Sequence, residues 1–216
     1  FNQPIDSWDT HNVTDMSTMF GNSAASFNQN ISAWDTRKVT TMANMFNGAT
    51  NFNQNIGSWI VSGVTSMQSL FYNNTSFNQD ISNWDVSSVI YMDSMFSLAS
   101  SFNQDIGNWN VSKVTNMSQM FSWNTSFNQP LSGWNVSNVV SMNGMFNNSL
   151  GFNQPIGNWN ISGVTDFTDF MLGKNENNYS VSNYNNLLNG WSNLFSVKPY
   201  ININFGSIKY SSDGLT

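Results

Sequence analysis

The sequence predicts an α/β solenoid of the leucine-rich-repeat kind, a right-handed superhelix with a parallel sheet on one face and short helices on the other. Two observations predict it. A block of 25 residues occurs seven times in the 216-residue chain, and each block joins a strand-like apolar pattern to a helix-like one. We expect residues 1–171 to form the seven-repeat solenoid and residues 172–216 to form a C-terminal capping segment.

Each repeat, called a unit below, begins with Phe-Asn-Gln and has a tryptophan seven residues after the phenylalanine. One unit cannot bury its apolar face alone, so stacked units are expected to pack Phe on Phe and Trp on Trp. The asparagines and glutamines are expected to form amide columns along the stack. Units 1 to 7 begin at Phe1, Phe27, Phe52, Phe77, Phe102, Phe127 and Phe152.

The first half of a unit has the pattern Ile-x-x-Trp-[Asp/Asn]-Val, which predicts a strand. Successive side chains of a strand point to opposite faces, so the residue between Trp and Val is expected on the exposed, concave face. Ile60 stands at this place in unit 3, and His11, Arg37, Lys38 and Lys113 lie beside the column. The predicted ligand-binding residues are Asp9, Asp35, Asp85, Asn110, Asn135 and Asn160.

The second half of a unit has the pattern Val-Thr-x-Met-x-x-Met-Phe, with apolar residues at i, i+3, i+6 and i+7. In unit 4 these are Val89, Met92, Met95 and Phe96. This spacing is typical of a helix. We therefore expect one short helix per unit on the convex side, with its apolar residues in the core.

The repeat stops after Met171, and the remaining pattern is that of a cap. Leu187, Leu188 and Trp191 have helical spacing, and residues 200–205 alternate like a strand. At the other end, Phe1 is in register with the repeat, which suggests a piece of a longer chain.

Composition excludes several classes of protein. Only 8% of the residues are charged and the net charge is −6, which disfavours nucleic acid as a partner. The chain has no cysteine and one histidine, so no cofactor and no thiolate or multi-histidine metal site is expected. Calcium held by neighbouring carboxylates, such as Asp80 and Asp105, is the minor alternative. No apolar run is long enough to insert into a membrane.

The block Trp84-Asp-Val-Ser-Ser-Val-Ile-Tyr-Met-Asp-Ser-Met-Phe96 resembles the repeats of BspA-like leucine-rich-repeat surface proteins. It is similar in particular to the branch described as a mycoplasma protein family of unknown function. The resemblance extends over about 170 residues in seven copies. It implies an extracellular or cell-surface location and an adhesive or binding role, and it supplies no catalytic residues.

These observations favour a non-catalytic module for adhesion or ligand recognition, whose partner is a protein or glycan on a host or neighbouring cell. The alternative is a structural spacer or coat element of a surface filament, surface layer or virion, without a specific ligand. Self-association end to end is compatible with either. An enzyme is not expected, because no known catalytic motif occurs and equivalent carboxylates in a ladder have no differentiated environments.

Overall fold

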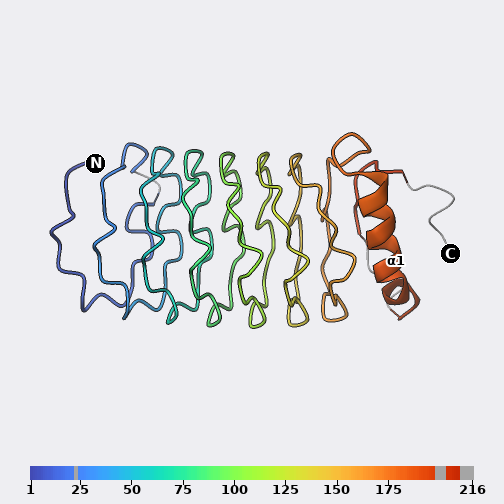
Figure 1. Cartoon of the computed structure of the whole chain (residues 1–216), viewed down its shortest axis with the longest axis horizontal. Coiled ribbons are helices and arrows are strands. Elements are labelled where there is room, and N and C mark those ends of the chain that lie inside the picture. Colours follow the sequence, from blue (N-terminus) through green and yellow to red (C-terminus); the bar gives the residue numbers. More distant parts are fainter. Residues whose placement is uncertain (22–23, 198–202, 210–216) are drawn as a thin grey trace.

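The computed structural model of the chain describes residues 1–21, 24–197 and 203–209. The units form an elongated stack, in which each makes one loop of chain on top of the loop before it (Figure 1). Unit 1 lies at one end of the stack. The helix α1 (Val181–Val197) lies against the other end.

The predicted α/β solenoid, with a parallel sheet and short helices, was wrong. Within the described part of the chain, α1 is the only helix, and no extended strand or sheet is present. Successive units are linked instead by isolated parallel bridges of single residues. These bridges lie in the half of the unit where a helix was predicted. They join Asp15, Thr41, Ser66, Tyr91, Asn116, Ser141 and Asp166 in order.

The segment predicted as a helix is a run of tight turns, as unit 4 illustrates. The N–H of Met95 donates to the Met92 carbonyl at 3.2 Å, which is the i to i+3 bond of a β-turn. The N–H groups of Met92 and Ser94 instead donate to Asn116 and Ser118 of unit 5, at 3.1 and 2.8 Å. A β-turn brings residues i and i+3 together as a helix does, so the apolar spacing does not distinguish the two.

Left-handed backbone conformations recur in these turns and interrupt any right-handed helix. They occupy two columns, and in units 2 to 7 the second lies four residues after the first; only three of the described positions are glycine. The first column, with φ between 52° and 58°, contains Thr18, Asn44, Ser69, Ser94, Gln119, Gly144 and Asp169. The second, with φ between 51° and 87°, contains Gly48, Asn73, Leu98, Trp123, Asn148 and Gly173.

The core consists of columns of apolar side chains that pass through the stack. Val89, Met92, Met95 and Phe96 have no exposed surface, so these residues face the interior as expected although the segment is not helical. Aromatic rings of successive units stack; the centroids of Phe77 and Phe102, for example, are 6.1 Å apart.

Tryptophan side chains join the units as well as filling the core. Trp109 is only 3% exposed, and its indole N–H donates to the carbonyl of Ile81 in the preceding unit at 3.2 Å. The same bond recurs from Trp34 to Trp159 at 3.0–3.2 Å. The Ile81 carbonyl also accepts the N–H of Trp84 in its own unit at 3.1 Å, so the indole adds a second bond that joins the two units.

Asparagine and glutamine side chains form a second set of links. Asn103 Oδ1 accepts the backbone N–H of Asn128 at 2.9 Å and the side-chain amide of Gln129 at 3.1 Å. The pattern continues to Asn153, the last member of the column. There the N–H of Ser180 and the amide of Asn183 take the two donor places, at 2.8 and 2.9 Å.

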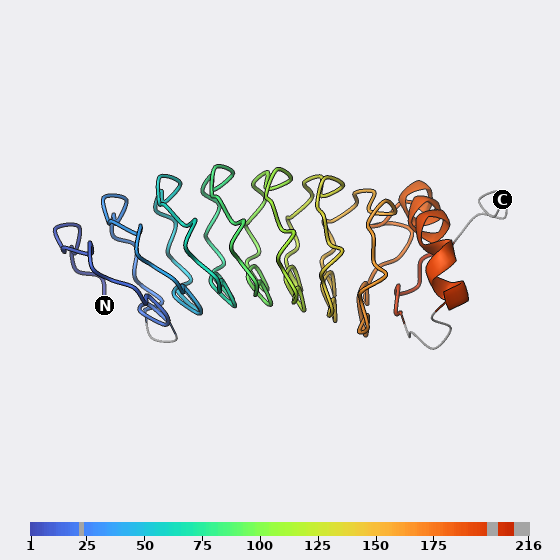
Figure 2. The ribbon, with the colours of Figure 1, turned by 90° about the horizontal axis from the view of Figure 1, so that it is seen from below.

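We name two sides of the stack by the bonds that join neighbouring units there. The ladder side runs in each unit from the bridge residue to the second left-handed residue, residues 91–98 in unit 4, and is linked by backbone hydrogen bonds. The turn edge runs from the tryptophan to the turn after it, residues 84–88 in unit 4. Figure 2 shows the stack fanned, with loops set wider apart along one edge than along the other.

Residues after the last unit cover its apolar face. Trp191 of α1 packs on Phe167 and Phe170, with ring centroids 5.6 and 5.7 Å away. Ile203 forms one parallel bridge with Phe167; residues 200–202 of the predicted strand lie outside the described residues. No described helix is both long and apolar enough to cross a membrane.

Candidate ligand-binding surface

The six predicted binding residues lie in one column along the turn edge, and each holds a turn together. The Oδ1 atom of the Asp or Asn accepts the backbone N–H two residues later, which is an Asx-turn. The bonds are 3.1–3.2 Å long. They run from His11 to Asp9, Arg37 to Asp35, Ser87 to Asp85, Ser112 to Asn110, Ser137 to Asn135 and Ser162 to Asn160.

This arrangement corrects the basis on which the column was predicted. The residues lie where the chain enters turns, and no sheet face underlies them. Five of the six are exposed and Asp35 is half-buried. One oxygen of each residue is committed to its turn, and in Asp35 the other oxygen accepts the Arg37 guanidinium. That they bind a ligand stays a prediction.

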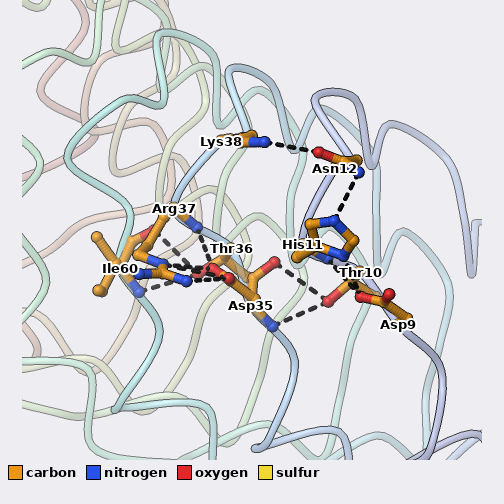
Figure 3. Close-up of polar contacts among 9 residues, drawn as sticks. All are labelled: Asp9, Thr10, His11, Asn12, Asp35, Thr36, Arg37, Lys38 and Ile60. Atoms are coloured by element: carbon orange, nitrogen blue, oxygen red, sulfur yellow. Dashed lines mark hydrogen bonds and ion pairs between the residues drawn. The ribbon is translucent and has the colours of Figure 1, made fainter.

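Units 1 and 2 differ from the others because charged side chains gather on their turns (Figure 3). His11 Nδ1 bonds Asp9 Oδ1 at 2.5 Å, and the Asn12 amide bonds His11 Nε2 at 2.7 Å. Lys38 Nζ reaches back from unit 2 to donate to Asn12 Oδ1 at 2.6 Å. The hydrogen bond from His11 lowers the pKa of the Asp9 carboxyl.

Arg37 lies against Asp35 in the same turn. Its Nε donates to Oδ1 at 2.9 Å and its Nη2 to Oδ2 at 2.5 Å, a two-point contact with the carboxylate. The guanidinium lowers the pKa of Asp35 to about 2. Asp35 therefore stays charged at any neutral or mildly acidic pH. The pair is exposed, so it fixes the shape of the turn more than it adds to stability.

Two threonines tie the first three units together at this edge. Thr10 Oγ1 donates to the Asp35 carbonyl at 3.1 Å and accepts the Asp35 N–H at 2.9 Å. Thr36 makes the same two contacts with Ile60, both at 2.9 Å. Valine occupies this place in units 3 to 6 and cannot form such bonds. The sequence shows that both threonines replace the expected valine. It was not recognised that they link neighbouring units.

A shallow hollow of about 330 Å³ opens between the turns of units 1 and 2. His11, Asp35, Arg37 and Lys38 line it. A second hollow lies between units 3 and 4, beside Ile60 and Asp85. Both lie on the turn edge, where no backbone ladder draws neighbouring units together. The first presents cationic and anionic groups side by side, which suits a polar ligand with paired charges.

Hydrogen bonds from nearby serines set the charge of two carboxylates, Asp80 and Asp85. The pKa values of Asp80 and Asp85 are lowered by hydrogen bonds from Ser82 and Ser87, which favour the charged form in both. A general acid would need the opposite shift. In the described ranges, no group of three or more histidine and carboxylate side chains is placed to hold a metal ion. Asp80 and Asp105 each close a turn at 2.9 Å.

Comparison with known proteins identifies one family. Residues 1–104 and residues 79–184 each match the family model described as "Mycoplasma protein of unknown function, DUF285". The two matches overlap at residues 79–104 and together span most of the chain. They support a repeat protein of the mycoplasma type, without confirming the BspA-like leucine-rich-repeat assignment. No curated protein and no solved structure is significantly similar to the chain.

Proposed function

This chain belongs to the family described as Mycoplasma protein of unknown function, DUF285, and we propose that it is a non-catalytic cell-surface module for adhesion or ligand recognition. The partner is a protein or glycan of a host or neighbouring cell. An extracellular location is proposed from the resemblance of the units to surface proteins. The finer assignment to BspA-like leucine-rich-repeat proteins is part of the same proposal.

One observation supports the proposal most. The side chains that recur in every unit are committed to holding the stack, as the bonds of Trp109 and Asn103 illustrate. The groups left for a partner are those that differ between units. The charged hollow of units 1 and 2 is such a place, in a chain with only 8% charged residues. A rigid support with a few distinctive side chains is what recognition requires.

Lys38 and Arg37 are the residues we expect to contact a partner. Both are exposed, and Lys38 extends across two units while Arg37 is held by Asp35. The purified chain would be tested for binding to arrays of defined extracellular proteins and glycans. Lys38→Ala and Arg37→Ala are expected to weaken the binding found by about tenfold each, as charged contacts at an interface do.

The chain provides matched controls. Lys113 stands at the place of Lys38 three units later, so Lys113→Ala removes the same charge away from the hollow. Asp35→Asn removes a charge but keeps the oxygen that closes the turn, as Asn110 does. We expect Lys113→Ala to bind normally and Asp35→Asn to bind weakly. Equal binding by all four variants would refute this choice of surface.

The structural alternative predicts a different outcome of the same experiment. Backbone hydrogen bonds join every pair of successive units, which favours a rigid rod with a mechanical role. In that case the native chain retains no partner from any array. End-to-end assembly in electron micrographs, together with absent binding, would then favour a spacer or coat element.

A further inference from the structure

Trp123 is an exception to the way this chain treats its aromatic residues. Its side chain is 53% exposed although it lies in the middle of the stack. Its backbone is left-handed, with φ of 57°. Bulky residues rarely adopt this conformation, because the Cβ approaches the following carbonyl too closely. The N–H of Trp123 donates to the Asn147 carbonyl at 2.8 Å, so the ladder imposes the conformation.

Leu98 repeats the exception one unit earlier. It stands in the same column with φ of 60°, and its N–H donates to the Ser122 carbonyl at 2.8 Å. The other members of the column are Gly48, Asn73, Asn148 and Gly173, residue types that tolerate a left-handed backbone. Two neighbouring units thus carry bulky residues that rarely adopt a left-handed backbone. Such outliers are typical of functional sites.

The neighbours of this pair are uncharged amides. Asn73 precedes Leu98 in the column and Asn148 follows Trp123. With about 4.8 Å between hydrogen-bonded units, the row of four side chains extends about 14 Å along the stack. Gln119 adds an exposed amide from the other left-handed column of unit 5. The row has an apolar centre with hydrogen-bonding groups at both ends.

We propose that the row Asn73, Leu98, Trp123 and Asn148 binds a neutral oligosaccharide along the stack. A sugar ring has a face of C–H groups and a rim of hydroxyls, so one face packs on the indole while the rim bonds the amides. The row contains no charge, which matches a neutral ligand. Binding through a few placed amides beside an aromatic ring is a common form of ligand recognition.

This surface is separate from the charged hollow. It lies on the ladder side, whereas Arg37 and Lys38 lie on the turn edge of other units. A nucleic-acid base also stacks on tryptophan, but the net charge of −6 and the lack of a cation in the row disfavour a phosphate backbone. The inference therefore adds a second binding surface to the proposed function and does not depend on the first.

The test uses the whole chain and a variant that the column itself supplies. Trp123→Asn introduces the residue present at Asn73 and Asn148, which suits a positive φ, and the variant is expected to unfold at the same temperature or higher. Tyr91→Asn is the matched control, because it also replaces an exposed ring by the asparagine found one unit later, Asn116. Neutral tri- to hexasaccharides of glucose, mannose, galactose and N-acetylglucosamine are the probes.

Calorimetric titration is expected to detect one of these sugars binding to the native chain and to Tyr91→Asn. Trp123→Asn should bind it about tenfold more weakly or not at all. Absence of binding to the native chain, or equal binding by Trp123→Asn, would overturn the proposal. Preference for an apolar peptide or for single-stranded DNA over every sugar would also overturn it. Lys38→Ala should bind the sugar normally, so this proposal and the turn-edge proposal can fail separately.

Discussion

On the ladder side of the stack, backbone N–H groups bond backbone carbonyls of the next unit, whereas at the turn edge the corresponding bonds come from side chains. This difference explains where the repeat is strict. Trp109 at the turn edge and Asn103 in the amide column, with their equivalents, supply the link themselves, so they recur in every unit. On the ladder side the exposed position of Tyr91 is filled by Asp, Thr, Ser or Asn in other units, because any residue supplies the backbone.

The largest expected effect tests the side-chain links. Trp109→Ala removes a ring that is 3% exposed and the indole donor to Ile81. Urea unfolding followed by circular dichroism should show a loss of about 3–5 kcal/mol, chiefly from the cavity that the ring leaves. Tyr91→Ala on the ladder side is the control and should change stability by less than about 0.5 kcal/mol. Similar losses in both variants would contradict the comparison.

Lys174 extends the comparison, because it is a side-chain link directly after the ladder side of unit 7. It is 1% exposed, and its Nζ donates to the carbonyls of Ser149 and Phe152. Burial lowers its pKa from 10.5 to about 7. At a pH between these two pKa values, the lysine is protonated in the unfolded chain but not in the folded one. Stability should therefore rise with pH across this window, by about 3 kcal/mol between pH 7 and about 9.5.

Lys174→Met is the matched variant for that experiment, since it keeps the length of the side chain and removes the titrating group. Unfolding free energies of both proteins would be measured in urea at several pH values from about 6 to 9.5. The difference between the proteins should shrink as the pH rises, because the native lysine loses its desolvation penalty. A constant difference would show that the lysine titrates normally and that its burial is not costly.

A smaller effect is expected for the amide column. Asn103→Ala leaves the Asn128 N–H and the Gln129 amide without their acceptor. Because these donors are partly exposed, the loss should be about 1–2 kcal/mol, measured as a shift in the urea midpoint. Asn108→Ala in the same unit is the control and should be neutral, since Ala33 stands at the same place in unit 2. Should both variants unfold alike, the amide column would not be a structural link.

Sequence reasoning predicted the core residues but not the backbone conformation. Met92, Met95 and Phe96 are buried as expected, because apolar burial depends on spacing that helices and successive β-turns share. The left-handed positions could not be predicted from composition, since Leu98 and Trp123 hold conformations normally marked by glycine. The ladder of the next unit imposes them, and that contact is not local.

The predicted binding residues were expected on a sheet face, whereas the structure places them in turns. Asp9 to Asn160 lie in one column because the 25-residue period places equivalent residues above one another. Their Asx-turns could have been recognised, since aspartate and asparagine commonly accept an N–H two residues later. The links from Thr10 and Thr36 required knowing which backbone groups of the next unit lie opposite.

The smallest predicted effect has the opposite sign. Gln119 is exposed and left-handed, with φ of 56°, and the next unit has Gly144 at the same place. Gln119→Gly removes the steric cost of a Cβ, about 1–2 kcal/mol, but adds the greater chain entropy of glycine, about 0.5–1 kcal/mol. A net gain of about 0.5–1 kcal/mol should follow, whereas Gln119→Ala, which keeps the Cβ, should be neutral. At the turn edge, Asn110→Gly loses the oxygen that accepts the Ser112 N–H and should lower the free energy of unfolding. The same substitution to glycine is therefore expected to stabilise unit 5 on the ladder side and to destabilise it at the turn edge.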